Sequence, residues 1–293
     1  MRDFTILFDQ AEPATLEHPA YKRYGPLGFP ALPARRPWIY SNFVQSLDGV
    51  ASYKGVNATG AHISQSAEDR WLMDLLRAHA DAVLLGINTL VEETASGRES
   101  GAGSARGPIY VVEDEQCREL RQTLGGRREL NIFVTGARPL NLADYAVFDG
   151  DRADAVIITT DDGARRLASS TSHPHVKVII AGHGQMVELP QAMATLRRDL
   201  RVERLLCEGG PTLYGYMSRA GLIDEKFITI SPVEIGLEIP REQQPSQAER
   251  AAPPRFRPST FGAPGFIKQN APWWRWMSCR RVGDHQFSRY RRV

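Results

Sequence analysis

The chain has 293 residues and a mass of 32.7 kDa, enough for one large α/β domain or two small ones. Hydrophobic residues make up 42% of it and charged residues 24%, which is ordinary for a globular protein with a sizeable core. The formal net charge of +2 argues against a partner that is nucleic acid or an anionic membrane.

The cysteines and the first residues of the chain indicate the cellular compartment of the protein. Cys117, Cys207 and Cys279 are odd in number and far apart, so neither a disulfide framework nor a zinc site is indicated, and we expect no metal. The first residues carry acids early and are unlike a signal peptide. No run of about 18 apolar residues occurs. We therefore expect a reduced, cytoplasmic protein without a membrane partner.

Residues 1–36 are spaced by prolines, among them Pro13, Pro19 and Pro26. Such a proline density is poorly compatible with a helix or a central strand. This pattern predicts an extended N-terminal arm, followed by one domain over residues 37–293.

The remaining chain alternates between short apolar runs and helical patterns. The helical pattern at 66–80 has Ser66 as a potential N-cap, and the pattern at 189–199 has Pro190 near its start. A third helix is expected at 211–221. Strands are expected at residues 38–46, 82–86, 108–112, 131–136, 155–160, 176–182, 202–208 and 225–232.

Strands separated by helices predict a three-layer α/β/α fold with a mainly parallel central sheet. Residues 237–272 are polar and rich in proline and glutamine, which predicts a long loop. The C-terminal residues alternate in polarity around Val282–His285, so a closing hairpin of antiparallel strands is expected.

Two glycine-containing turns suggest a ligand site. One follows the strand at 202–208 and reads Glu208-Gly209-Gly210-Pro211; the other follows the strand at 82–86 and begins at Gly86. Both lead into helices, whose first N–H groups attract anions, and ligands of open α/β sheets bind at this edge. A dinucleotide would fit two such turns, although simple turn formation is the alternative for each. The fingerprint G-x-G-x-x-G is absent, which argues against a standard Rossmann domain.

The stretch 46–65 is polar and glycine-rich and leads into a helix, as expected of a loop that folds over a ligand. Asp48 precedes Gly49 there and is either a turn residue or part of the site.

Four segments in this order, NFVQSLDGVAS, LLRAHADAVLLGINT, CEGGPTLYGYMSRAGLIDE and ITISPVEIG, resemble the reductase domain of bacterial riboflavin biosynthesis, the RibD C-terminal type. The resemblance covers roughly residues 37–236. It implies a dihydrofolate-reductase-like fold in which NADPH delivers a hydride to an open-chain ribosylamino-pyrimidine and turns the ribose into a ribityl group.

The resemblance also implies roles for individual residues. Glu93 and Asp48 are the expected catalytic residues. The expected substrate contacts are Gly60, Ser64, Arg77 and Glu208, with Arg77 holding the substrate phosphate unless it is an exposed helix arginine. The expected cofactor contacts are Val44, His62, Gly86, Asn88, Thr89, Gly209, Gly210, Pro211, Thr212, Leu213 and Tyr214.

Two stretches depart from the family pattern. After the threonine that corresponds to Thr89, the family pattern has an Asp, then Asp or Asn followed by Pro, and then Leu and Arg. Here Glu93 stands at the acid's place, the Pro and Leu are missing, and Arg98 is an approximate match for the arginine. In addition, Glu113–Glu115 are acidic where a 2′-phosphate reader is expected, so NADH is an alternative to NADPH.

The leading hypothesis is thus an NAD(P)H-dependent pyrimidine reductase, closest to reduction of 5-amino-6-(5-phosphoribosylamino)uracil, with a small-molecule substrate and a homodimeric state. One alternative is a dihydrofolate- or pterin-type reductase on the same fold. Another is a non-catalytic nucleotide-binding paralogue. The H-x-E and P-C-x-x-C motifs of a deaminase domain are absent from the chain.

Overall fold

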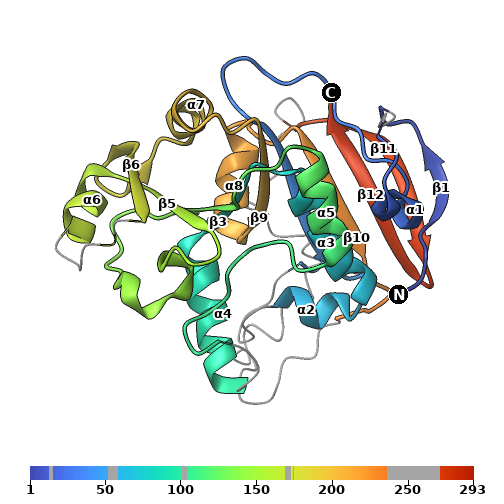
Figure 1. Cartoon of the computed structure of the whole chain (residues 1–293), viewed down its shortest axis with the longest axis horizontal. Helices are drawn as coiled ribbons and strands as arrows, with labels where there is room; N and C mark the ends of the chain where they lie inside the picture. Colours follow the sequence, from blue (N-terminus) through green and yellow to red (C-terminus); the bar gives the residue numbers. More distant parts are fainter. Residues whose placement is uncertain (13–15, 52–58, 101–103, 169–172, 174, 236–270) are drawn as a thin grey trace, which may run out of the picture.

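The computed structural model of the protein describes residues 1–12, 16–51, 59–100, 104–168, 173, 175–235 and 271–293 (Figure 1). The loop predicted at 237–272 lies almost entirely outside these residues. Within them, ten strands form one sheet. Its order is β1 (Thr5–Asp9), β11 (Trp274–Val282), β12 (His285–Arg292), β10 (Glu225–Ile230), β2 (Trp38–Gln45), β9 (Arg204–Gly209), β3 (Ala82–Gly86), β4 (Leu130–Val134), β5 (Asp154–Thr159) and β6 (Val176–Ile180).

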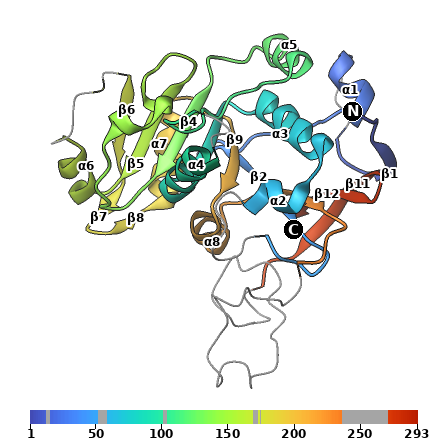
Figure 2. The same ribbon diagram turned by 90° about the horizontal axis from the view of Figure 1, so that it is seen from below.

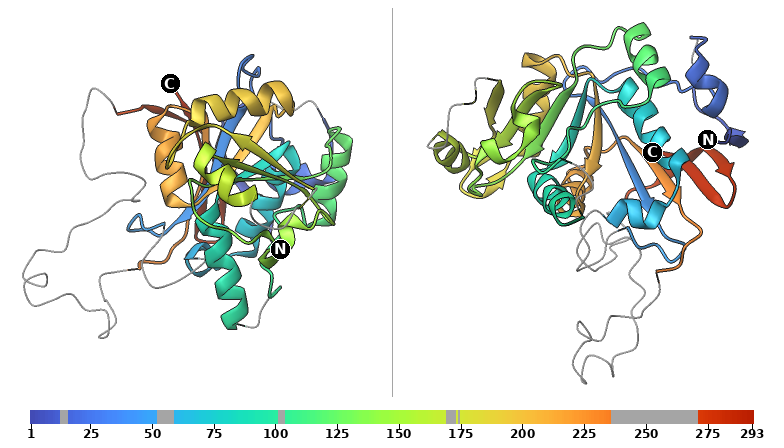
Figure 3. Two further views of the ribbon diagram at one scale, coloured as in Figure 1. Left: turned by 90° about the vertical axis from the view of Figure 1, so that its left-hand side faces the viewer. Right: turned by 60° about the horizontal axis from the view of Figure 1, so that its bottom comes forward.

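The sheet is parallel from β10 through β6 and antiparallel where β10, β12, β11 and β1 pair. Figure 3 shows β6 at one end of the sheet and the antiparallel strands at the other. The predicted fold class, with a mainly parallel sheet and a C-terminal antiparallel hairpin, is confirmed.

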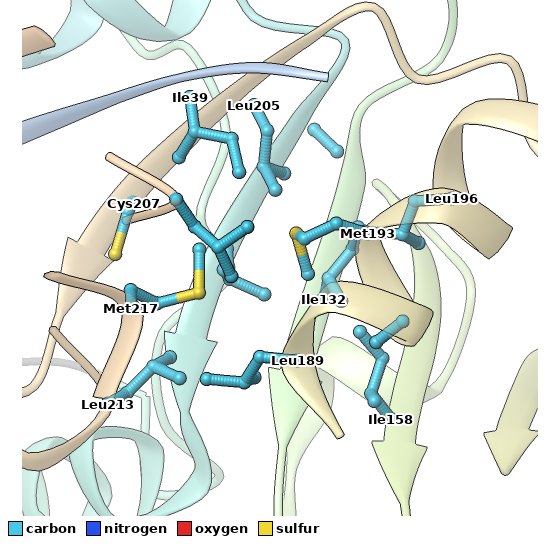
Figure 4. Close-up of a cluster of buried hydrophobic side chains, with 14 of the residues drawn as sticks. Ile39, Ile132, Ile158, Leu189, Met193, Leu196, Leu205, Cys207, Leu213 and Met217 are labelled. Atoms are coloured by element: carbon cyan, nitrogen blue, oxygen red, sulfur yellow. The ribbon is translucent and has the colours of Figure 1, made fainter. Parts of the chain in front are cut away.

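Helices cover both faces of the sheet because side chains alternate along its buried strands. Leu84 of β3 faces a core made with α7 (Leu189–Asp199) and α8 (Pro211–Arg219), in which Met193 and Met217 face the strands (Figure 4). Leu85 faces the other side, which is covered by α4 and the η helices. Farther along that face lie α1, α3 and α5 (Figure 2).

The helices on the face toward Leu85 are α1 (Pro19–Tyr24), α3 (Ala67–His79), α4 (Ile87–Ser100), α5 (Glu115–Thr123), η1 (Leu142–Asp144) and η2 (Ala146–Phe148). Helix α6 (Asp161–Ala168) lies on the same side, because its Leu167 joins the core under α4. The other elements are α2 (Thr59–Ser64) and the short ribbon of β7 (Gly182–His183) and β8 (Met186–Val187). The cap predicted for α3 is confirmed, because Ser66 Oγ accepts a hydrogen bond from Asp69 N at 3.2 Å.

The strand predicted at 108–112 is wrong. The place beside β3 belongs to β4, and residues 108–112 instead form an irregular segment that packs on one face of the sheet, where Tyr110 and Val112 are buried. Tyr110 N donates to Asn131 Oδ1 at 2.9 Å, and Asn131 Nδ2 donates to Tyr110 O at 2.8 Å. A buried side chain of β4 therefore satisfies the backbone of Tyr110 in place of a neighbouring strand.

The expectation that residues 1–36 hold no helix is also wrong. Helix α1 begins at Pro19, where a proline is well tolerated because the first N–H of a helix has no intrahelical partner. His18 caps the helix by accepting from Ala20 N at 3.2 Å. Strand β1 lies at the edge of the sheet, where the segment adds one more antiparallel pairing.

The N-terminal segment packs into the core. The ring of Phe4 lies 4.8 Å from that of Phe287, 5.1 Å from that of Tyr24 and 5.8 Å from that of Trp71. Arg280 connects the segment to β11, because its Nε donates to Tyr24 O at 2.6 Å and its guanidinium pairs with Asp9. Residues 4–9 and 18–24 are thus part of the folded unit in this structure.

We expect Phe4→Ala to lower the free energy of unfolding by about 3–5 kcal/mol, because it empties the centre of an aromatic cluster. Leu7→Ala in the adjoining strand β1 is the matched control: Leu7 is 56% exposed, so its loss should change stability by less than about 0.5 kcal/mol. Urea unfolding of both variants measures this. Equal stabilities for the two variants would mean that the segment is a loosely attached arm.

Candidate active site

The two predicted glycine turns lie side by side at the carboxyl ends of β3 and β9. Leu85 pairs with Gly209 across these strands. A Cβ atom on Gly210 would stand 2.8 Å from Thr89 Oγ1, and a Cβ atom on Gly86 would stand 3.7 Å from Gly210 N. Gly209 has a φ of 106°, which glycine adopts without strain. The turns therefore approach each other so closely that a side chain on Gly210 would require the Thr89 hydroxyl to move.

A cavity of about 490 Å³ opens beside these turns. Helix α8 begins there with Gly210 as its N-cap, and no side chain caps it. The first N–H groups of a helix have no intrahelical partner, so those of Thr212 and Leu213 are available to a ligand. The lining is Gly86–Thr89, Glu92, Val134–Arg138, Gln185–Val187, Leu189, Gly210–Leu213 and Tyr216.

A second cavity, of about 700 Å³, lies on the other side of the same turns. Thr89, Glu92, Gly210 and Pro211 line both cavities, which therefore meet at this point. The remaining lining comes from β2, α2, α3, α4, the end of β9 and the segment 108–112: Asn42–Val44, Ala51, Gly60, Ala61, Ser64–Ala67, Asp69, Arg70, Met73, Arg77, Leu85, Glu93, Pro108–Tyr110 and Glu208.

A buried ion pair forms one wall of the larger cavity. Arg77 Nε donates to Glu208 Oε1 and Arg77 Nη2 donates to Glu208 Oε2, both at 2.7 Å, and both side chains are less than 10% exposed. Arg77 Nη1 also donates to Val111 O at 3.0 Å. Glu208, together with Asp74, favours the charged guanidinium and raises the pKa of Arg77, although burial acts in the opposite direction. Glu208 thus neutralises Arg77, and this fork does not fit the phosphate-binding role predicted for Arg77.

Glu93 lies in the same cavity and accepts a hydrogen bond from the hydroxyl of Tyr110 at 2.7 Å. Burial raises the pKa of the Glu93 carboxyl, and the negative charge of Glu208 adds to this effect. The hydrogen bond from Tyr110 and the charge of Arg77 act in the opposite direction. A carboxyl group with a raised pKa can remain protonated at higher pH and act as a proton donor.

Most of the predicted site residues come together around the two cavities. The larger cavity contains Val44, Gly60, Ser64, Arg77, Glu93 and Glu208, and the smaller one contains Gly86, Asn88, Thr212 and Leu213. Thr89, Gly210 and Pro211 line both, and Gly209 precedes them. His62 and Tyr214 line neither: His62 is exposed on α2, and Tyr214 is buried in the core, its ring 4.7 Å from Phe43.

Asp48, predicted to be catalytic, does not line either cavity. Its carboxylate accepts hydrogen bonds from Ser46 Oγ at 2.5 Å and from Ile235 N at 3.2 Å. In the structure Asp48 therefore organises the turn that follows β2, which was the alternative for this residue.

The acidic stretch 113–115 lies away from both cavities. Asp74 accepts hydrogen bonds from Glu113 N and Asp114 N, and Asp114 caps α5 by accepting from Cys117 N at 3.0 Å. Glu113 also pairs with Arg152. The predicted strand at 108–112, which would have brought this stretch to the cofactor edge of the sheet, is not formed. The choice between NADPH and NADH stays a prediction.

The cavity residues that were not predicted include Asn42, Arg70, Tyr110 and Arg138. Asn42 Oδ1 is a buried atom without a hydrogen-bond partner among the described residues, as expected of a group that awaits a ligand. Arg138 follows β4, and its Nη1 donates to Asn88 Oδ1 at 2.6 Å. A correct placement of β4 beside β3 would have drawn attention to Arg138 at the sheet edge.

The described residues hold neither a metal-binding cluster of side chains nor a membrane-spanning helix. No group of three or more His, Cys, Asp or Glu side chains there could hold a metal ion. In the same part of the chain, no helix has the length and apolar character needed to cross a membrane.

The protein is thus an α/β protein with an open sheet and two adjacent cavities at the carboxyl ends of its strands, where ligands of such sheets bind. The chain belongs to the RibD C-terminal domain family, whose family model matches residues 37–260. The resemblance stated from the sequence is thereby confirmed.

Two similar relatives are archaeal proteins named 2,5-diamino-6-ribosylamino-4(3H)-pyrimidinone 5′-phosphate reductase. The one from Methanothermobacter thermautotrophicus is 28% identical over 203 residues, which cover 69% of this chain and 80% of the relative. The one from Archaeoglobus fulgidus is 30% identical over 213 residues, which cover 69% and 83%. A solved pyrimidine reductase-like protein from Corynebacterium diphtheriae has the same fold, with a TM-score of 0.60, 20% identity, and coverage of 94% of this chain and 99% of that one.

We expect Arg77→Met to lower the free energy of unfolding by about 3–5 kcal/mol, because it leaves the Glu208 carboxylate buried and unpaired. The double variant Arg77→Met, Glu208→Met should lose much less, since it removes both charges. The control is Arg152→Ala: its pair with Glu113 is about half exposed on both sides, so the loss should stay below about 1 kcal/mol. Denaturant unfolding measures all three, and additive losses in the double variant would contradict the expected coupling.

Proposed function

We propose that this protein is an NAD(P)H-dependent reductase of riboflavin biosynthesis that acts on a phosphoribosylamino-pyrimidine. The relatives' names favour 2,5-diamino-6-ribosylamino-4(3H)-pyrimidinone 5′-phosphate, and the sequence resemblance favours the corresponding uracil. The observation that carries the proposal is the junction of the two cavities at Thr89 and Gly210, because a reductase must hold cofactor and substrate in contact.

The smaller cavity fits a nicotinamide dinucleotide. A Cβ on Gly210 would close the approach to Thr89, and the free N–H groups of Thr212 and Leu213 suit a pyrophosphate. Bound there, the cofactor would supply the hydride. We propose that Arg138 binds the 2′-phosphate of NADPH, because it is an exposed arginine in the lining of this cavity. The acidic stretch 113–115 does not line this cavity.

The larger cavity fits the substrate. In the proposed reaction the ring oxygen receives a proton and becomes a hydroxyl as its bond to the anomeric carbon breaks, which gives the open-chain iminium form. The former anomeric carbon of this form then receives the hydride. We assign this proton to Glu93, whose carboxyl has a raised pKa and lies in the cavity wall. Asn42 Oδ1, buried and without a protein partner in the described chain, would accept a hydrogen bond from the substrate.

The substrate phosphate needs a cation, and Arg77 is already neutralised by Glu208. Arg70 is exposed, lines the larger cavity and makes no side-chain hydrogen bond to the described residues. We therefore assign the phosphate to Arg70 as a charge-assisted contact.

The direct test is oxidation of NADPH and NADH by the purified protein with three substrates: the diaminopyrimidinone phosphate, the aminouracil phosphate and dihydrofolate. We expect turnover with one of the two phosphorylated substrates. Turnover with dihydrofolate alone would support the pterin-type alternative. Cofactor binding without turnover of any substrate would support the non-catalytic alternative, and an absence of cofactor binding would overturn the proposal.

We expect Arg138→Gln to raise the KM for NADPH about tenfold and to leave the KM for NADH unchanged, because one phosphate contact is worth about 1.4 kcal/mol on this scale. Steady-state kinetics with both cofactors measures the ratio. Arg165→Gln changes an arginine outside both cavities and should alter neither value. A similar loss for both cofactors would show that Arg138 does not read the phosphate.

We expect Arg70→Gln to raise the KM for the phosphorylated substrate about tenfold, with little effect on its dephosphorylated analogue. The comparison of kcat/KM for the two compounds measures this. Arg118→Gln, an exposed arginine outside both cavities, is the control. Equal losses for the two compounds would assign Arg70 another role.

A homodimer and a cytoplasmic location stay predictions. The described surface that best supports a dimer is the end of the sheet at β1 and β11, where Ile6, Leu7 and Trp276 are 50%, 56% and 44% exposed.

A further inference from the structure

Tyr110 is held unusually firmly for a residue outside regular structure. Both of its backbone groups bond to the side chain of Asn131, which is fully buried on β4. Its own side chain is 4% exposed and packs beside Phe133, with ring centroids 6.0 Å apart. The guanidinium of Arg77 lies 5.8 Å from the centre of the Tyr110 ring and bonds to the next carbonyl, that of Val111.

These contacts fix the position of the Tyr110 hydroxyl, which donates a hydrogen bond to Glu93 Oε2 at 2.7 Å. When the Glu93 carboxyl is neutral, this contact leaves its proton on the other oxygen, Oε1. Pro108, Ile109 and Tyr110 also line the larger cavity beside Glu93. The segment thus does two things at once: it closes the cavity and orients the acid.

We propose that Tyr110, fixed by Asn131, is a positioning residue that orients the Glu93 carboxyl as the proton donor of the reduction. This inference rests on the proposed function, but the contact that carries it belongs to the protein alone. Tyr110 acts through Glu93 and need not touch the substrate.

The charges around Glu93 come from four parts of the fold. Glu92 of α4 and Glu208 of β9 disfavour the ionised carboxylate, and Arg77 of α3 favours it. The Tyr110 hydroxyl favours it as well, because it donates to the carboxylate. Asp69 and Arg70 line the same cavity from α3. Removing the Tyr110 hydroxyl deletes one of the favourable contributions, so ionisation of Glu93 should then require a higher pH.

The test uses Tyr110→Phe, which removes one oxygen and keeps the packed ring. We expect kcat to fall about tenfold because the acid is less well oriented, while KM stays close to its wild-type value. We also expect the alkaline limb of the kcat–pH profile to move to higher pH, since the protonated acid is the active form. Tyr145→Phe, the same change at a residue that lines neither cavity, should have neither effect.

A second readout does not depend on turnover. Infrared titration of the full chain without cofactor or substrate follows the band of the protonated carboxyl, and Glu93→Gln identifies this band by its loss. In Tyr110→Phe the midpoint should move to higher pH. An unchanged midpoint and an unchanged pH profile, even with a lower kcat, would reduce Tyr110 to a packing role and overturn the inference. A shifted midpoint in a protein that reduces none of the substrates would instead overturn the proposed function.

Discussion

The site depends on the close approach of the turns that end β3 and β9. A Cβ atom on Gly210 would require the Thr89 hydroxyl to move, and the left-handed conformation of Gly209 directs the chain from the strand into α8. Because β3 and β9 are adjacent in the sheet, this approach brings the starts of α4 and α8 to one point. The two cavities meet there, so the geometry of a few backbone atoms determines where a cofactor and a substrate can come into contact.

The charge of the larger cavity follows from the same arrangement. Glu208 ends β9 immediately before the glycines, and its carboxylate would be costly to bury alone. Arg77 of α3 supplies the counter-charge and also bonds to the carbonyl of Val111, so a single guanidinium joins α3, β9 and the segment 108–112. Burial raises the pKa of Glu93, the charges of Glu208 and Glu92 add to this effect, and the charge of Arg77 acts against it. The two members of the ion pair therefore influence the neighbouring acid in opposite directions.

The sequence was a good guide wherever the signal was local. The apolar run at 82–86 and the helical pattern at 189–199 match β3 and α7, because strand and helix periodicity require only neighbouring residues. It failed where distant residues decide. Residues 108–112 have the composition of a strand, yet Asn131 and β4 displace them from the sheet. The pairing of Arg77 with Glu208 joins residues 131 positions apart, and no spacing rule could indicate it.

The departure of this chain from the family pattern after Thr89 now has a structural counterpart. A proline shortly after the acid would interrupt a helix there, and without it α4 continues from Ile87 to Ser100. Arg98 therefore does not line either cavity, and its Nε instead donates to the carbonyl of Ala105. Residues 108–110 line the larger cavity beside Glu93. The same segment brings the Tyr110 hydroxyl to Glu93, the residue that stands at the place of the family's acid, so the environment of this acid depends on a segment outside regular secondary structure.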